Sequence, residues 1–235
     1  MMIKTVRPAR KHLALLAALL GMMVAQPLIG HRSVAGGAAS DTVLSAICLY
    51  VFFIVFEERR HWRAALLLLF PAIAGNFAIY VLPRGAHIAP QVVYHCFMVA
   101  FLGFAVTVIL RDILAKSVIR GDDVIGAICG YILMALVWAN LYTLTYLLVP
   151  GTFTVNPDIA GRLGEWHQRR ALFDYLSFTT LMTLGYGDIT PIGPPAYTLT
   201  WLEVLFGQFY MAVVVAQLVG LKLAQALRGG SPEGK

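Results

Sequence analysis

The interpretation of this sequence depends on six residues, Thr183-Leu184-Gly185-Tyr186-Gly187-Asp188. The two glycines, two positions apart, permit backbone angles that side chains oppose. The 12 residues before them, 171–182, are mostly apolar and would form about 18 Å of helix at about 1.5 Å per residue. Because such a helix is too short to cross a membrane, the segment predicts a re-entrant helix that ends at the glycine-rich stretch.

Long apolar blocks surround this stretch. The chain has 235 residues, of which 59% are hydrophobic and 13% charged, whereas soluble chains carry about 25% charged residues. About 20 apolar residues cross a bilayer, and in lipid each backbone group must bond within its own element. The sequence therefore predicts an all-α membrane protein with six transmembrane helices. They are expected at 13–29, 42–56, 64–82, 88–110, 124–149 and 197–221.

Lys and Arg gather at alternate ends of these segments: at the N-terminus, after the second and fourth segments, and at the C-terminus. Positive residues mark the cytoplasmic side. We therefore expect a multi-pass protein of the cell (plasma or inner) membrane, with both termini cytoplasmic and lipid as a partner. The connection 150–196 then lies outside, and its first half, 151–170, is expected to be an exposed loop. The net charge of +6 sits in short loops, so no nucleic-acid partner is expected.

The first segment has a second interpretation. A basic start followed by an apolar run also fits a signal peptide, with a cleavage site in the small residues 35–39. Because the apolar run is longer than a usual signal core, we favour a retained helix. Either interpretation leaves the orientation of the other five segments unchanged.

The glycine-rich stretch resembles the selectivity-filter signature of potassium channels, Thr-Val-Gly-Tyr-Gly-Asp, with Leu184 in place of valine. Residues 173–221 are similar to the pore loop and inner helix of bacterial channels in the ion-channel two family. With the helix before them, the resemblance covers about 124–227. It implies a potassium-channel pore fold: a re-entrant pore helix and selectivity filter between an outer and an inner helix.

The resemblance also implies which residues bind the ion. In such pores, rings of backbone carbonyls from four chains replace the water shell of K⁺. The filter here would be Thr183, Leu184, Gly185, Tyr186 and Gly187, with K⁺ at the first four. One filter segment per chain cannot close a ring, so we expect a homotetramer.

Other residues of the pore carry expected roles. Tyr175 stands where the family often has an aromatic partner for the filter tyrosine, and Asp188 would place carboxylates at the outer mouth. Glu203, the acidic residue of the last segment, would either support the filter from behind, which we favour, or reach the outer interface. Gly207 matches a family hinge, but small residues also allow close helix packing. The resemblance places three side chains on the cavity: Met211, Val215 and Val219.

These observations divide the chain into three parts. Residues 1–120 would form a four-helix bundle of unknown role, 121–228 the pore domain, and 229–235 a short cytoplasmic tail. The segment 88–110 contains no Lys or Arg, so a conventional voltage sensor is not expected. His95, within that segment, is expected to be a packed, hydrogen-bonded side chain.

The expected function is passive, potassium-selective conduction, with K⁺ as the permeant ion and no cofactor. A weakly selective cation channel is an alternative, because Leu184 departs from the signature. A non-conducting polytopic protein is a further alternative. An enzyme is not expected, since only Glu203 and His95 would be available as catalytic groups in the apolar blocks and no common catalytic or nucleotide-binding motif occurs.

Overall fold

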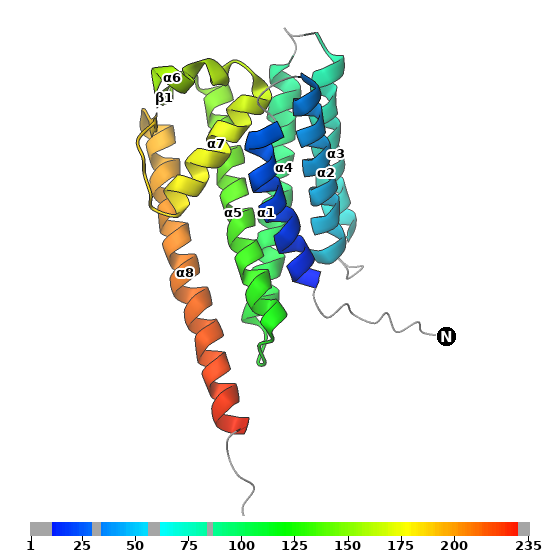
Figure 1. The fold of residues 1–235 in the computed structure, drawn as a ribbon, viewed down its shortest axis with the longest axis vertical. Coiled ribbons are helices and arrows are strands. Elements are labelled where there is room, and N and C mark those ends of the chain that lie inside the picture. The colour runs from blue at the N-terminus through cyan, green and yellow to red at the C-terminus, as the bar shows by residue number, and fades with distance from the viewer. Residues whose placement is uncertain (1–10, 30–33, 56–61, 84–86, 230–235) are drawn as a thin grey trace, which may run out of the picture.

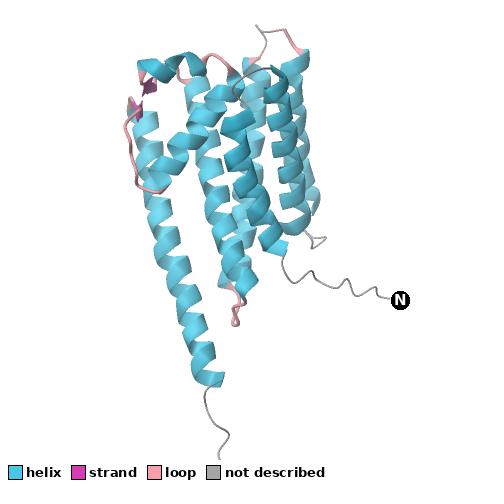
Figure 2. Cartoon of the chain, viewed as in Figure 1, coloured by secondary structure: helices cyan, strands magenta, loops and turns pink. Residues whose placement is uncertain are grey.

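The computed structural model describes residues 11–29, 34–55, 62–83 and 87–229, and this part of the chain is almost entirely helical (Figures 1 and 2). Its elements in chain order are α1 (Lys11–Ile29), α2 (Val34–Val55), α3 (Trp62–Val81), α4 (Ile88–Leu114), α5 (Gly121–Leu148), β1 (Phe153–Val155), α6 (Pro157–Ala160), η2 (Gly161–Leu163), α7 (Trp166–Leu181), β2 (Ile189–Pro191) and α8 (Pro194–Gly229).

Four helices, α3, α4, α5 and α8, are long and apolar enough to cross a membrane. Shorter apolar stretches, His12–Ala25 and Thr42–Phe53, lie in α1 and α2. A predominantly helical chain with four helices capable of spanning a membrane is thus confirmed, and the count of six spans stays a prediction. Parts of the predicted topology lie outside the described residues: Lys4, Arg7, Arg10, Arg32, Arg59, Arg60, Arg84 and the tail residues 230–235.

Helix α5 lies at the centre of the molecule. It packs against α1 and α4 on one side and against α7 and α8 on the other. Figure 1 shows α1–α4 gathered beside α5, α7 running obliquely across it, and α8 at the opposite edge. The first residue of α1 and the last residue of α8 lie at the same end of the molecule, and α7 lies toward the other end.

The start of α5 agrees with the sequence. The fifth apolar segment was expected at 124–149, and α5 begins three residues earlier at Gly121, in the polar run 120–123. The Asp123 carboxylate accepts a hydrogen bond from the Arg120 backbone N–H at 2.8 Å, which caps the helix. Two acidic residues in the first turn, Asp122 and Asp123, also suit the positive end of the helix dipole.

The start of α7 corrects the sequence-based prediction. The helix begins at Trp166, five residues before the predicted start, inside the stretch expected to be an exposed loop. The prediction failed because Arg169 and Arg170 read as polar loop residues. Both side chains are buried, with 8% and 5% of their surface exposed.

A two-stranded antiparallel ribbon, β1 with β2, was not predicted. It pairs Phe153 with Pro191 and Val155 with Ile189, and it joins the loop before α7 to the chain that follows Asp188 (Figure 2). Strands of three residues carry no hydrophobic alternation that sequence reasoning could detect.

Candidate functional site

The candidate site starts where α7 ends. The backbone N–H groups of Met182, Thr183 and Leu184 donate to the carbonyl oxygens of residues 178, 180 and 179 at 3.0, 2.9 and 2.7 Å. These bonds satisfy carbonyls that a helix end leaves unpaired. The chain therefore leaves the helix in a fixed direction rather than as a free loop.

The backbone angles of the next residues alternate. Thr183, Gly185 and Gly187 have positive φ values of 58°, 55° and 79°, whereas Leu184 and Tyr186 between them do not. Glycine adopts this conformation without a Cβ penalty, but threonine does so at a cost. Within the described part of the chain, no backbone amide donates to the carbonyl oxygens of residues 183–187. Five successive carbonyls are thus left available.

Two tyrosines at this stretch stack on each other, and the side chains within the stretch are exposed. The rings of Tyr175 and Tyr186 are parallel, with centroids 6.4 Å apart and an angle of 5° between their planes. Leu184 and Tyr186 are 53% and 68% exposed in the single chain. The backbone carbonyl of Asp188 accepts from the Asn156 backbone N–H at 2.8 Å, which ties the end of the stretch to the segment after β1.

Glu203 of α8 is completely buried between three helices. It is hydrogen-bonded to the Tyr142 hydroxyl of α5 and, at 2.5 Å, to the Ser177 hydroxyl of α7. Ser177 also lies 2.6 Å from the carbonyl oxygen of Ala135, which can only accept. A serine hydroxyl has one hydrogen, so Ser177 donates to either the Glu203 carboxyl or the Ala135 carbonyl at one time. This burial leaves no path by which the carboxyl reaches the outer interface.

Glycines of α8 and α5 lie where these helices closely approach side chains of other helices. A Cβ on Gly207 would lie 2.7 Å from Cδ1 of Leu181, at the end of α7, and α8 runs through Gly207 without a break. A Cβ on Gly130 would lie 2.8 Å from the hydroxyl of Tyr210. One on Gly126 would meet the ring of His12 at 3.3 Å. These contacts support the packing interpretation of Gly207, and Gly126 and Gly130 pack closely in the same way.

Helix α8 has one buried and one exposed stripe beyond Gly207. Tyr210, Val214 and Leu218 are buried against the rest of the chain. The three residues expected to line the cavity lie on the exposed stripe of the single chain: Met211 is 48% exposed, Val215 43% and Val219 61%. Residues four apart share a helix face, so these three form one apolar row that no described part of the chain covers.

Several polar side chains at the site escaped the sequence reasoning. Tyr142 and Ser177 hold Glu203, and the Tyr131 hydroxyl donates to the Leu181 carbonyl at the end of α7 at 3.1 Å. Single hydroxyls inside apolar helices carry no spacing signal. The consecutive arginines at 169 and 170 were visible but were assigned to a loop.

His95 lies as expected for a packed residue. It is 1% exposed and its Nδ1 lies 2.8 Å from the side-chain oxygen of Asn140. Among the residues that the structure describes, no three His, Cys, Asp or Glu side chains lie close enough to hold a metal ion. The absence of a cofactor remains a prediction.

Comparison with known proteins gives an independent result. Residues 141–221, which span the end of α5, all of α7 and most of α8, match the family described as "Ion channel". The chain is also 30% identical to Protein LctB of Bacillus caldotenax over 131 residues, which are 51% of this chain and 93% of that protein. No solved structure matches the chain significantly. Together with the membrane-spanning helices, these matches show that the chain is a multi-pass membrane protein of the ion-channel family.

Proposed function

We propose that four copies of this chain form a potassium-selective channel, with residues 183–187 as the selectivity filter. The observation that carries the proposal is the alternation of φ along this stretch together with its unbonded carbonyls. Backbone angles that alternate in this way, which glycine permits, would let successive carbonyls point toward one axis. Four such segments, one from each chain, would surround an axis and offer rings of carbonyl oxygens in place of the water shell of K⁺.

The surroundings of the filter support the same proposal. The C-terminal end of α7, at Leu181, directly precedes the filter, so the negative end of its dipole would face a cation in the cavity below. The stack of Tyr175 on Tyr186 would brace the filter from the side. Asp188, half-buried directly after the filter, would raise the local cation concentration at the outer mouth.

The exposed row on α8 supports a cavity on the inner side of the filter. In a tetramer, Met211, Val215 and Val219 of each chain would face the axis. Rows of apolar side chains there would not replace the hydration shell of the ion, so the ion would stay hydrated until it reaches the filter. Residues 121–228 would thus form the pore domain, with residues 1–120 as a bundle beside it.

The proposed location is the cell membrane, with both termini in the cytoplasm. Within the described residues, α1 begins and α8 ends at the same end of the molecule (Figure 1). The α4–α5 connection, with Lys116 and Arg120, lies at that end as well. This agrees with the tendency of basic residues to stay on the cytoplasmic side.

The proposal is tested by the efflux of K⁺ from vesicles, which makes their interior negative and draws in a cationic dye. The purified protein is reconstituted into liposomes loaded with K⁺, and the uptake of a potential-sensitive dye is followed after dilution into Na⁺. We expect K⁺-driven uptake from the unaltered chain. Gly185→Ala should abolish it, because an alanine side chain opposes the φ of 55° at that position. Gly164→Ala, outside the filter where φ is negative, serves as the control. Equal flux from Gly185→Ala and the unaltered chain would contradict the assignment of the filter.

A further inference from the structure

Two consecutive arginines, Arg169 and Arg170, are the fourth and fifth residues of α7, where its first turn ends. The positive end of the helix dipole disfavours cations at this place, and burial of a charge costs free energy unless the charge is paired. Nevertheless, both side chains are more than nine-tenths buried. Their partners must offset these costs, so the partners identify what the arginines do.

Arg169 joins α7 to three other elements. Its Nη2 donates to the side-chain oxygen of Gln91 on α4. Its Nη1 donates to the carbonyl oxygen of Leu163 in η2 at 3.0 Å. The guanidinium also lies over the ring of Tyr146 on α5, 5.6 Å from its centroid. A planar guanidinium with its hydrogen bonds in fixed directions holds such partners in one geometry.

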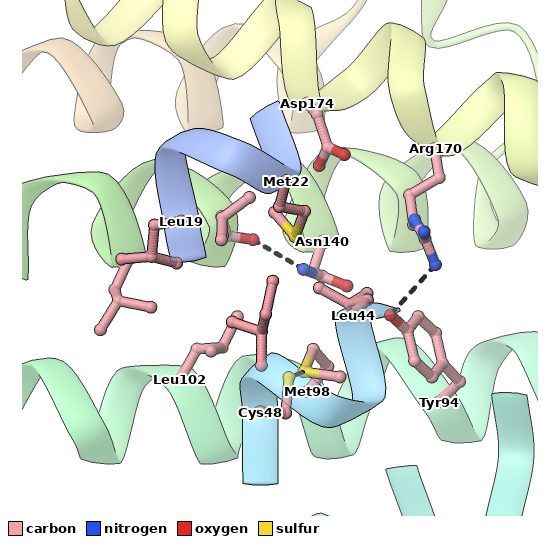
Figure 3. Close-up of a pocket in the computed structure, with 13 residues that line it drawn as sticks. Leu19, Met22, Leu44, Cys48, Tyr94, Met98, Leu102, Asn140, Arg170 and Asp174 are labelled. Carbon is pink, nitrogen blue, oxygen red and sulfur yellow. Dashed lines mark hydrogen bonds between the residues drawn. The ribbon is translucent and has the colours of Figure 1, made fainter. Parts of the chain in front are cut away.

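Arg170 reaches into the bundle of the first helices. Its Nη1 lies 3.5 Å from the hydroxyl of Tyr94 on α4, and its guanidinium lies over the ring of Trp166 at 5.4 Å. Figure 3 shows Arg170 and Asp174 of α7 at a pocket that is otherwise lined by helices of the bundle and by α5. Leu19 of α1 and Leu44 of α2 line the same pocket. The pore helix thus extends two side chains into the N-terminal bundle.

The α4 residues that receive the arginines are themselves held firmly. Gln91, Tyr94 and the adjacent His95 are buried, with 5%, 1% and 1% exposed. His95 is bonded to Asn140 of α5. On the other side α3 approaches closely, since a Cβ on Gly75 would lie 3.1 Å from the Tyr94 backbone nitrogen. A displacement of α3 or α4 would therefore be transmitted to the arginines.

The other end of α7 is attached to different elements. Ser177 is bonded to Glu203 and to the Ala135 carbonyl, and the Leu181 carbonyl to Tyr131. Because α7 is one continuous helix, a displacement at its start changes the load on these contacts near its end. The end of α7 is two residues from Thr183, where the proposed filter begins.

We propose that the N-terminal helices regulate ion conduction and that they act through helix α4. Its residues Gln91 and Tyr94 position the pore helix by their contacts with Arg169 and Arg170. This proposal rests on the proposed function in so far as α7 leads into a conducting filter. It assigns a role to the helices before residue 115, for which sequence reasoning found none. The four residues are positioning residues, since none of them lies in the filter.

The test uses the full chain in nanodiscs and planar bilayers. Gln91→Leu removes the acceptor of Arg169, and Tyr94→Phe removes only a hydroxyl. The matched control is Gln168→Leu, which makes the same change one residue before Arg169 at a half-buried position. Loss of a hydrogen bond to a charged group shifts an equilibrium by roughly tenfold or more. We expect a shift of about that size in the ratio of open to closed channels for Gln91→Leu and a smaller one for Tyr94→Phe. The preference for K⁺ over Na⁺ should not change.

Rescue and a readout without conduction make the test specific. Gln91→Glu keeps an oxygen acceptor for Arg169 and should preserve the open probability. Hydrogen exchange of the backbone amides of residues 170–178 should be faster in Gln91→Leu than in Gln168→Leu. An unchanged open probability in Gln91→Leu would overturn the proposal, whether or not exchange increases. If the unaltered chain does not conduct at all, the proposed function fails, and the exchange experiment alone then decides whether α4 positions α7: equal exchange overturns that claim.

Discussion

At the scale of single residues, the glycine-rich stretch and the buried arginines show what a sequence reveals and what it conceals. Gly185 and Gly187 could be singled out because a positive φ is a local demand on one residue. Arg169 could not be placed correctly because its acceptor, Gln91, is 78 residues away in the chain. The interactions that hold Glu203 were missed for the same reason, since Ser177 and Tyr142 belong to two other helices.

Glu203 gives a prediction at this scale. Glu203→Gln keeps an oxygen that accepts from Tyr142 and gains an N–H that donates to Ser177, so conduction and stability should be largely retained. Glu203→Ala leaves two buried hydroxyls without that partner, which costs about 1–3 kcal/mol for each unpaired group. We expect lower thermal stability of the assembly and a lower open probability in Glu203→Ala. Single-channel recording and thermal unfolding in detergent measure the two effects.

A control at an exposed acidic residue separates the effect of losing the hydrogen bonds of Glu203 from the effect of removing a negative charge. Glu165→Gln and Glu165→Ala change an exposed carboxyl just before α7 and should differ little from each other. If Glu203→Gln proves as damaging as Glu203→Ala, Glu203 acts through its charge and not through the hydrogen bonds described here.

At the scale of elements, hydrophobic blocks located the long helices well. The predicted starts of α4 and of α5 agree with the structure to within three residues, because an apolar run and a polar cap are both local signals. The start of α7 and the β1–β2 ribbon were missed, since tertiary contacts create them. Helix α8 continues through Gly207, and the close contact of this glycine with Leu181 supports a packing role, while the hinge stays a prediction.

The packing of α8 on α7 is tested at Gly207. Gly207→Ala would place a methyl group 2.7 Å from Cδ1 of the buried Leu181, and overpacking of this kind typically costs about 1–3 kcal/mol. We expect a lower unfolding temperature for Gly207→Ala. Gly220→Ala, at a position of α8 with nothing within 4 Å in the described chain, should be neutral or slightly stabilising. Equal unfolding temperatures for the two variants would leave a hinge as the explanation for Gly207.

At the scale of the whole molecule, the single chain leaves apolar surface on α8 uncovered. Large side chains along that helix are 42–59% exposed: Trp201, Leu205, Phe206 and Phe209. Contiguous apolar surface in the described chain requires lipid or another chain to cover it. We expect mass measurement in nanodiscs to give four chains per particle. Particles with one or two chains would contradict the tetramer, and with it the closed ring of carbonyls.

The central claim is selective conduction of potassium through residues 183–187, and one measurement tests it most directly. A bilayer that contains the reconstituted protein is placed between equal concentrations of potassium and sodium chloride, and the voltage at which the current reverses is recorded. The account predicts a reversal potential far from zero, with the potassium side negative, because K⁺ crosses the pore and Na⁺ carries little current. A reversal potential near zero, as a weakly selective cation pore would give, would contradict it.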